Sequence, residues 1–387
     1  MGNSQSPPAD PRFSSATRAF TPKDLEDLNS LFVSLAAQSK SNNEYISLSV
    51  FQSVYEKGTR DDIEEFIYQL LNVTGDGVVG RCDIESVLAA ILRSIFSLET
   101  SNPGLNSHRE IINVFLNAAK FSKVVEGAPE KSMSFEDFRS WCALLPSVRK
   151  FLGSLLIPPD AGRLGSQVPQ LVHGDNINPD LIVMREEYAW HIGGALPHHE
   201  LEEWKLLYHS AINGMSFNTF LGSTSNGEGP TILIIKDKDG YIYGGYASQP
   251  WERHGDFYGD LKSFLFQLYP KASIFKPTGA NNNVQWCAAN FSSESIPNGI
   301  GFGGRVNHFG LFLSASFDVG QTFTCTTFGS PCLSKTNRIF PEVIECWGVV
   351  QNGAQEEKLD AAKATVLERF KEDRHMLNMV GLANSSE

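Results

Sequence analysis

One twelve-residue segment of the chain, from Asn72 to Asp83, carries oxygen-bearing residues at a spacing that could hold a calcium ion. Asn72, Thr74 and Asp76 occupy positions 1, 3 and 5, and a glycine follows at position 6. The carbonyl of Val78 at position 7 and the carboxylate of Asp83 at position 12 complete the ligand set that such a loop uses. The chemistry that this pattern offers is coordination of a hard cation by oxygen atoms.

The segment departs from a strong calcium site in ways that lower its expected affinity. Position 12, usually a glutamate that binds calcium through both oxygens, is the shorter Asp83, and Asp76 is the only other carboxylate among the ligands. A second frame, residues 126–137, has Ala128 at position 3 and Lys131 where glycine is required, so we expect no metal there. We therefore expect an EF-hand-like packing scaffold that requires no cofactor, with calcium at the first loop as the alternative.

The start of the chain offers a different chemistry, covalent attachment of a lipid. Its first six residues, Met-Gly-Asn-Ser-Gln-Ser, fit the pattern for N-myristoylation of Gly2, with Ser6 at the required position. One acyl chain gives only marginal, reversible membrane binding, and Arg12 and Arg18 are the only basic residues nearby. A partner protein is therefore expected to supply the second contact.

Two groups of residues could carry enzymatic chemistry in the second half of the chain. Asp260, Ser263, His308 and Glu345 could form a hydrolytic or redox constellation, whereas the competing interpretation assigns them to caps and buried hydrogen bonds. Thiols could scavenge oxidants if they were exposed in an electropositive setting, but apolar neighbours predict inert ones. The thiols concerned are Cys287, Cys325, Cys332 and Cys346.

Three further motifs have weaker support as chemical sites. The glycine-rich segment Gly299–Gly304 lacks a following helix, so it is expected to form a tight turn that lets two sheets approach, and not a phosphate loop. His198 and His199 lack the spacing of a metal-binding helix. Asp237–Gly240 lies between two strand-like runs, so the Asp-Gly pair predicts a hairpin turn without metal.

The composition excludes several classes of protein. The chain of 387 residues has 41% hydrophobic residues and a formal net charge of -12, which favours two folded domains and disfavours a nucleic-acid partner. Its six cysteines lack CxxC spacing, as expected for reduced thiols in the cytoplasm. No run of apolar residues is long enough to span a bilayer, and the start lacks a secretion signal.

Hydrophobic periodicity divides the chain into five parts. Residues 1–20 lack periodicity and are expected to be disordered, whereas residues 21–150 repeat apolar side chains at helical intervals and predict at least five helices. The proline- and glycine-rich residues 151–180 predict a linker. Residues 181–350 show strand-like runs separated by turns, and residues 351–387 predict a C-terminal helix and tail. The expected fold class is α+β.

Two helices are expected to flank the strands of the second half. One runs from Glu200 to Ala211, where Leu201, Trp204, Leu207 and Tyr208 share one face. The other runs from Gln355 to Val380 and carries an apolar stripe that could fit a groove on a partner. The candidate partner-binding residues of this second helix are Val366, Phe370, Met376, Leu377 and Met379.

The second half also carries ordered blocks that together resemble a TLDc domain. The blocks are Ser216-Phe217, Gly229-Pro230, Lys236–Gly240, Gly244–Ser248, Trp251, Phe257–Asp260, Ser263–Phe266, Asn298–Gly304, Phe309–Leu311, Cys325–Ser334 and Ile344–Gly348. Together with the Met-Gly-Asn-Ser start and the EF-hand-like region, the whole chain resembles the plant and animal TLDc proteins that include a lysosomal member associated with the target of rapamycin.

This resemblance implies a β-sandwich with flanking helices, no established catalytic activity, a link to oxidative-stress resistance and binding to the vacuolar proton-pumping ATPase. In the lysosomal relative, the helix after the TLDc domain takes part in pump contact, and the Gln355–Val380 segment holds that place here.

The sequence thus predicts a non-enzymatic TLDc adaptor that binds a membrane complex such as the vacuolar pump and acts in stress or growth signalling. We expect it in the cytoplasm, peripheral on a lysosomal, vacuolar or plasma membrane. Two alternatives stay open. One is an oxidant-handling or hydrolytic enzyme that uses the TLDc loops, and the other is a calcium-responsive switch protein.

Overall fold

A computed structural model describes residues 60–73, 78–96, 105–125, 130–154, 165–174, 177–224, 229–293 and 295–350. The chain folds as two compact units, each with its own core. The first reaches Gln167 and includes Lys271–Ser273, and the second comprises the remaining residues from Val168 onward. Helices are confined mainly to the first unit and strands to the second, so the predicted α+β class is confirmed.

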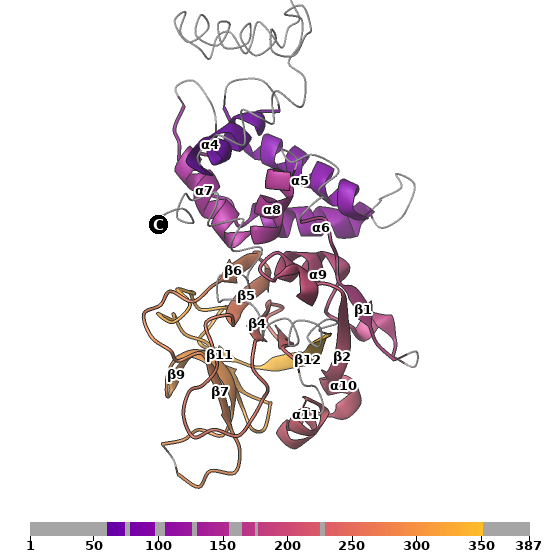
Figure 1. Cartoon of the computed structure of the whole chain (residues 1–387), viewed down its shortest axis with the longest axis vertical. Helices are drawn as coiled ribbons and strands as arrows, with labels where there is room; N and C mark the ends of the chain where they lie inside the picture. Colours follow the sequence, from indigo (N-terminus) through magenta and orange to yellow (C-terminus); the bar gives the residue numbers. More distant parts are fainter. Residues whose placement is uncertain are drawn as a thin grey trace, which may run out of the picture. The chain divides into compact units, whose positions relative to one another are not determined.

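Five helices make up the described part of the first unit (Figure 1). They are α4 (Arg60–Leu70), α5 (Arg81–Phe96), α6 (Leu105–Leu116), α7 (Phe135–Leu144) and α8 (Pro146–Ser154). Their apolar residues recur every three or four positions, as Ile84, Leu88, Ile91 and Leu92 do along α5, and all four are buried. The indole Nε1 of Trp141 donates to the Phe115 carbonyl at 3.1 Å, so α7 and α6 share a buried hydrogen bond.

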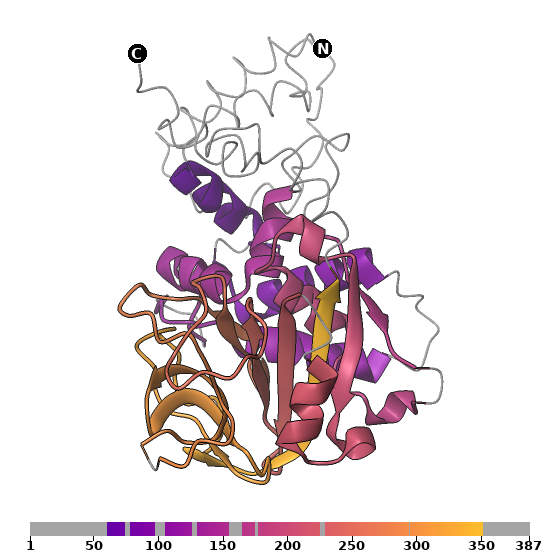
Figure 2. The ribbon, with the colours of Figure 1, turned by 60° about the horizontal axis from the view of Figure 1, so that its bottom comes forward.

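The second unit contains a seven-stranded sheet. Its strands are β1 (Gln170–Val172), β2 (Glu203–His209), β12 (Pro341–Val350), β3 (Thr231–Asp237), β4 (Ile242–Ala247), β5 (Phe264–Tyr269) and β6 (Ser273–Phe275), in that spatial order. β1 runs parallel to β2, whereas β12 runs antiparallel to both of its neighbours. The last strand in the sequence therefore lies inside the sheet, between β2 and β3 (Figure 2, yellow strand).

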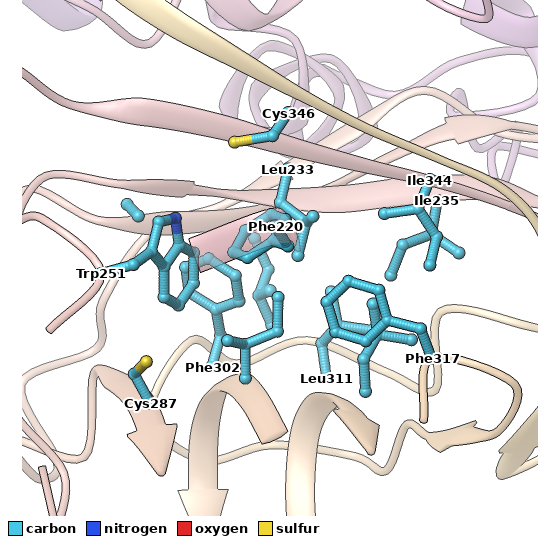
Figure 3. Close-up of a cluster of buried hydrophobic side chains, with 14 of the residues drawn as sticks. Phe220, Leu233, Ile235, Trp251, Cys287, Phe302, Leu311, Phe317, Ile344 and Cys346 are labelled. Carbon is cyan, nitrogen blue, oxygen red and sulfur yellow. The ribbon is translucent and has the colours of Figure 1, made fainter. Parts of the chain in front are cut away.

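A second, five-stranded sheet packs against the first. Its order is β11 (Arg338–Ile339), β10 (Gly320–Gln321), β9 (His308–Ser314), β8 (Gly299–Arg305) and β7 (Gln285–Ala288), and the paired strands are antiparallel. Between the sheets lies an apolar core, in which Leu233, Ile235 and Ile344 of one sheet face Phe302 and Leu311 of the other (Figure 3). Burial of this alternating pattern from both sheets is the main source of stability of such a sandwich.

The opposite face of the seven-stranded sheet is covered by residues 181–201. This segment includes α9 (Glu186–Gly193), which is buried from Glu187 onward, and the short 3-10 helix η3 (His198–Glu200). The hydroxyl of Tyr246 in β4 donates to Glu200 at 2.7 Å, and the indole of Trp204 donates to the Glu200 carbonyl at 2.8 Å. A further 3-10 helix, η2 (Pro179–Leu181), precedes this segment, and α10 (Ser210–Asn213) and α11 (Phe217–Thr224) follow β2.

Two sequence-based predictions about single elements are wrong. The expected helix from Glu200 to Ala211 is mostly strand β2, in which Trp204 and Tyr208 are fully buried. The expected turn at Gly299–Gly304 is strand β8, paired with β7 and β9. In both places the tertiary pairing partner, which local periodicity cannot reveal, decides the conformation.

The stretch predicted as a linker, residues 151–180, contains regular elements in its described part. Helix α8 continues to Ser154, β1 adds Gln170–Val172 to the edge of the sheet, and η2 begins at Pro179. Among the helices that the structure describes, none combines the length and the apolar character needed to cross a bilayer.

Candidate functional site

The two predicted calcium-loop frames lie next to each other in the first unit. Val79 and Met133 form an isolated antiparallel bridge, in which the Met133 amide donates to the Val79 carbonyl at 2.8 Å. Both residues occupy position 8 of their frames, the position at which two EF-hand loops pair. A helix flanks each loop, with α4 and α5 around the first and α7 after the second.

Of the five predicted calcium ligands, Asn72, Val78 and Asp83 lie in described residues, whereas Thr74 and Asp76 lie outside them. Asp83 is only 2% exposed, and its Oδ2 accepts a hydrogen bond from the Gly80 amide at 2.8 Å. This contact caps the start of α5. Within the described ranges, no three His, Cys, Asp or Glu side chains are grouped so that they could share a metal ion.

The last residue of the second frame, Asp137, accepts several hydrogen bonds from protein donors. Its Oδ2 accepts hydrogen bonds from the Ser122 hydroxyl at 2.6 Å, the Ser122 amide at 3.0 Å and the Ser134 amide at 3.0 Å. Ser134 and Asp137 also form a reciprocal capping box at the start of α7. Burial opposes ionisation of this carboxyl, but the hydrogen bonds from Ser122 and Ser134 outweigh burial and lower its pKa to about 2.

Glu345, one of the candidate catalytic residues, lies at the centre of β12 and is completely buried. Its carboxylate accepts hydrogen bonds from the Val183 amide, from the Met184 amide at 3.1 Å and from the Trp347 indole at 2.9 Å. His209 Nε2 lies 3.6 Å from Glu345 Oε1. We call these five residues the Glu345 cluster. Burial raises the pKa of Glu345, and the hydrogen bonds oppose that rise.

The imidazole of His209 is fixed by its own contacts. Its Nδ1 accepts a hydrogen bond from the Ala211 amide at 3.2 Å, so in the neutral ring Nε2 carries the proton. Nε2 lies 3.0 Å from the Leu181 carbonyl and can donate to it. Glu345 binds the amides of Val183 and Met184, and His209 contacts the Leu181 carbonyl, so residues 181–184 at the start of the domain are held against β12 and β2.

Asp260 and Ser263, two other candidate catalytic residues, bind each other through Ser248. Asp260 accepts hydrogen bonds from the Ser248 hydroxyl at 2.6 Å and the Gln249 amide group at 3.0 Å. Ser263 Oγ lies 2.9 Å from Ser248 Oγ and donates to Gln285 at 3.2 Å. Burial opposes ionisation of Asp260, but its hydrogen bonds prevail and lower its pKa. This network joins the β4–β5 connection to β7.

The remaining candidate, His308, lies apart from these networks at the start of β9. Its ring is exposed and lies 5.1 Å from the Phe323 ring. The other predicted histidines are found in η3, where His199 Nε2 lies 3.9 Å from Glu200 Oε1. The structure therefore places Asp260 with Ser263, but it does not bring His308 or Glu345 to them.

The turn at Asp237–Gly240 forms the β3–β4 hairpin, as the Asp-Gly pair predicts. Gly240 adopts a φ of 82°, and Asp237 Oδ1 accepts hydrogen bonds from the Asp239 and Tyr241 amides, both at 3.0 Å. Asp237 Oδ2 accepts from the Tyr243 hydroxyl at 3.0 Å and from Ser334. Sequence reasoning missed this contact with Ser334, because no local signal relates residues 97 positions apart.

Most of the cysteines are buried. Burial raises the pKa of Cys142, Cys287 and Cys346 to about 12, which disfavours the reactive thiolate. Cys325 is also buried, whereas Cys332 is partly exposed and its sulfur lies 3.3–3.5 Å from three backbone carbonyls. None of the six forms a disulfide, and Cys82 is exposed.

Strand β8 explains the glycine-rich motif without a phosphate ligand. A Cβ at Gly299 would lie 2.0 Å from the Leu313 carbonyl oxygen and 2.8 Å from the Phe312 ring. A Cβ at Gly301 would lie 2.6 Å from the Leu311 carbonyl oxygen. Glycine is therefore needed because β9 and its Phe312 ring approach β8 closely.

The residues predicted to bind a lipid or a partner lie outside the described parts of the chain. They are Gly2 and the C-terminal residues Val366, Phe370, Met376, Leu377 and Met379. Their roles remain predictions.

Comparison with known proteins identifies the second unit. Residues 178–350 match the family model described as the TLDc domain. The "MTOR-associated protein MEAK7" of Danio rerio is 36% identical over 189 residues, covering 48% of this chain and 41% of the relative. The protein of that name from Gallus gallus is 26% identical over 373 residues, covering 87% of this chain and 76% of the relative.

A differently named relative matches a shorter segment. "Oxidation resistance protein 1" of Xenopus tropicalis is 35% identical over 144 residues, covering 37% of this chain and 16% of the relative. The chain spans about two fifths of the length of the first curated relatives that it matches, 41% and 42%. The family match includes every strand of the two sheets except β1, and residues 178–350 of this chain are therefore a TLDc domain.

Proposed function

We propose that this chain is a regulatory protein of stress or growth signalling that acts by binding other proteins. The proposal rests on the contacts of the side chains that were candidates for catalysis. In the described part of the domain, Asp260, Ser263 and Glu345 are engaged in hydrogen bonds that join separate segments. The names of the relatives, which refer to mTOR association and to oxidation resistance, support a regulatory role.

The proposed partner is a membrane complex such as the vacuolar proton-pumping ATPase. The resemblance to TLDc proteins supports this choice. In the proposal, the TLDc domain and the C-terminal residues Val366, Phe370, Met376, Leu377 and Met379 contact the complex, and a myristoyl group on Gly2 adds reversible membrane affinity. The protein would then be cytoplasmic and peripheral on a lysosomal, vacuolar or plasma membrane.

The test uses purified vacuolar pump, the full-length myristoylated chain and two variants, which are Gly2→Ala, without the acceptor for the acyl chain, and a truncation that lacks residues 355–387. In detergent, the myristoylated chain without substitutions and the Gly2→Ala variant should bind the pump equally. Removal of residues 355–387 should weaken binding. On pump-free vesicles, Gly2→Ala alone should lose affinity, because only the acyl chain contacts lipid there. Absence of pump binding by the myristoylated chain without substitutions would refute the proposed partner. Undiminished binding after the truncation would refute the role of the C-terminal residues.

A calcium-responsive switch is the second candidate, and the Val79–Met133 bridge favours it because calcium loops pair in this way. Calorimetric titration of the full chain with calcium tests it. Binding heat that disappears in Asp76→Ala would support a site in the first loop, and absence of heat would leave the paired loops as a metal-free scaffold.

The alternative of an oxidant-handling or hydrolytic enzyme has its own test. Turnover of peroxide or of an ester by the full chain, abolished by Asp260→Asn or by a cysteine substitution, would favour the enzyme and contradict the proposal.

A further inference from the structure

A hollow of about 290 Å³ lies at one end of the sandwich in the second unit. Three separate elements form its wall. The α10–α11 connection and the start of α11 supply Met215, Ser216, Phe217 and Asn218, the β7–β8 connection supplies Asn290 and Asn298, and the β9–β10 connection supplies Ala315 (Figure 1 labels α10, α11, β7 and β9). None of the residues considered above as a catalytic or metal-binding candidate lines it.

The polar part of the wall consists of amide and hydroxyl groups without a charge. Asn298 is used to fix the wall, because its side chain accepts from the Phe291 amide at 2.9 Å and donates to the Phe291 carbonyl at 2.8 Å. The side-chain amides of Asn218 and Asn290 make no hydrogen bond within the described part of the chain, and both residues are exposed. Each offers one acceptor and two donor hydrogens to a ligand.

The backbone holds Asn290 in an unusual but accessible conformation. Its φ is 57°, in the left-handed region that asparagine tolerates better than most residues. Its carbonyl accepts a hydrogen bond from Arg253 at 3.2 Å, and the Arg253 guanidinium lies 4.4 Å from the Phe291 ring. Asn290 is thus presented by a loop that several contacts fix in place.

The apolar part of the site combines a rigid base with an adaptable rim. Phe217 is 5% exposed and its ring packs 5.8 Å from that of Phe317, so it forms a fixed base. Met215 is 40% exposed, and Ile212, three residues earlier at α10, is 47% exposed. A methionine side chain can adapt to different apolar shapes, which suits it to a binding surface.

We propose that this hollow binds an uncharged, extended peptide segment of a partner protein. Asn218 and Asn290 pair with peptide N–H and C=O groups, and Met215 contacts one apolar side chain of the segment. The inference rests on the proposed role in protein binding and adds to it a location and a class of ligand. It does not depend on the identity of the partner.

Two features favour a neutral peptide over other ligands. Among the described residues that line the hollow, none has a charged side chain, so an ionic group placed beside them would lose hydration without gaining a counter-charge. Phe217, the aromatic residue among the described lining residues, is buried and therefore presents no open ring face on which a sugar could stack.

The test follows the asparagine side-chain NH₂ signals and the Met215 methyl signal of the full chain by nuclear magnetic resonance. The probe is acetyl-Ala-Leu-Ala-amide at millimolar concentration, and the matched probes are acetyl-Ala-Asp-Ala-amide and maltose. We expect the leucine peptide alone to shift the Asn218, Asn290 and Met215 signals in a saturable way. Equal shifts with maltose or the aspartate peptide, or no shift with the leucine peptide, would overturn the proposal.

Substitutions locate the binding. Asn218→Ala and Asn290→Gly should each weaken the leucine peptide about fivefold, the effect of one lost hydrogen bond. Glycine preserves the backbone conformation at position 290. Asn282→Ala, an exposed asparagine on the same β7 side of the domain but outside the hollow, should have no effect. Unchanged affinity in both hollow variants would also overturn the inference.

Two controls separate this inference from the proposed function. In the absence of a probe, removal of residues 351–387 should leave the Asn218 and Asn290 signals unchanged. A change would mean that the C-terminal residues of the chain occupy the hollow, which would contradict the proposal. Pump binding is measured on the same samples. Pump association without peptide binding would refute this inference alone. Peptide binding without pump association would refute the proposed partner alone.

Discussion

Two buried carboxylates, Asp137 in the helical unit and Glu345 in the TLDc domain, have nearly the same number of donors and opposite acid–base behaviour. Asp137 accepts from two serines at the start of a helix, and its pKa falls to about 2. Glu345 accepts from two amides and an indole inside a sheet, and its pKa rises. Hydrogen bonds stabilise the ionised form in both places, so the difference lies in how completely water is excluded.

The buried carboxylates Asp83 and Asp137 have a different structural role from Glu345. In the helical unit, Asp137 and Asp83 cap helices beside the paired loops, where a metal ligand would stand in an EF-hand. In the TLDc domain, Glu345 joins the first segment of the domain to its last strand across 161 positions of sequence. Asp137 and Asp83 thus act on their own helix ends, whereas Glu345 joins segments that are far apart in the sequence.

The largest effect is expected for Glu345→Ala. Removing the carboxylate leaves the Val183 and Met184 amides and the Trp347 indole buried without their acceptor, which should lower the free energy of unfolding of the domain by about 4 kcal/mol. Chemical denaturation followed by tryptophan fluorescence measures the loss. Glu342→Ala, on the same strand but half exposed in a pair with Lys236 at 3.3 Å, is the matched control and should cost less than about 1 kcal/mol.

A smaller and more local effect is expected for Asp137→Ala. It removes the capping box of α7 and the acceptor of Ser122, which should cost about 1–2 kcal/mol in the helical unit. Hydrogen exchange should increase at α7 and leave β12 unchanged. Glu136→Ala, exposed and adjacent, controls for the charge of the first turn, and an equal effect of the two substitutions would contradict the capping role.

The two carboxylates should also give pH dependences of opposite sign. Asp137 has a folded pKa of about 2, below its unfolded value of about 3.9, so its contribution to stability is present above that value and is lost as pH falls towards 2. Glu345 has a folded pKa above its unfolded value of about 4.3. Its contribution is therefore fully present below pH ~4.3 and declines as pH rises through the folded pKa.

Denaturation midpoints measured across acid and neutral pH for the unmodified chain, Asp137→Asn and Glu345→Gln test these signs. The stability difference between the unmodified chain and Asp137→Asn should grow with rising pH, and the difference from Glu345→Gln should shrink. If both stability differences changed in the same direction with pH, burial would not account for the difference between the pKa shifts of Asp137 and Glu345.

The last prediction compares the two units by the reactivity of their thiols, and we expect the smallest effect on stability there. Cys82 is exposed at the start of α5, whereas burial raises the pKa of Cys287 and Cys346 to about 12. Under native conditions an alkylating reagent should modify Cys82 first and reach the two domain thiols only after unfolding. Peptide mass mapping gives the order, and early modification of Cys287 would favour the oxidant-handling alternative.

Several features could be predicted because they depend on neighbours in the sequence. Apolar residues at helical spacing identified α5, and the Asp-Gly pair identified the hairpin between β3 and β4. The ordered blocks from Ser216 to Gly348 identified the TLDc domain. The spacing of the two loop frames also puts Val79 and Met133 at position 8 of each frame, and these two residues form the bridge.

Other features depend on residues that are distant in sequence, and these required the folded chain. Leu201, Trp204, Leu207 and Tyr208 fit a helical stripe, yet residues 203–209 form β2 because β12 supplies a strand that pairs with them. Gly299–Arg305 form a strand because β7 and β9 pair with them, and the glycines at 299 and 301 leave room for Phe312 of β9.

The sequence by itself determined the class of the fold, the family and the residue types available for chemistry. The tertiary structure alone decided that Glu345 binds Val183 and Met184, that Asp260 binds Ser248, and that Asn218 and Asn290 line one hollow. The physical reason is that helical and turn preferences act over a few residues, whereas sheet pairing and burial bring together groups whose separation along the chain carries no local signal.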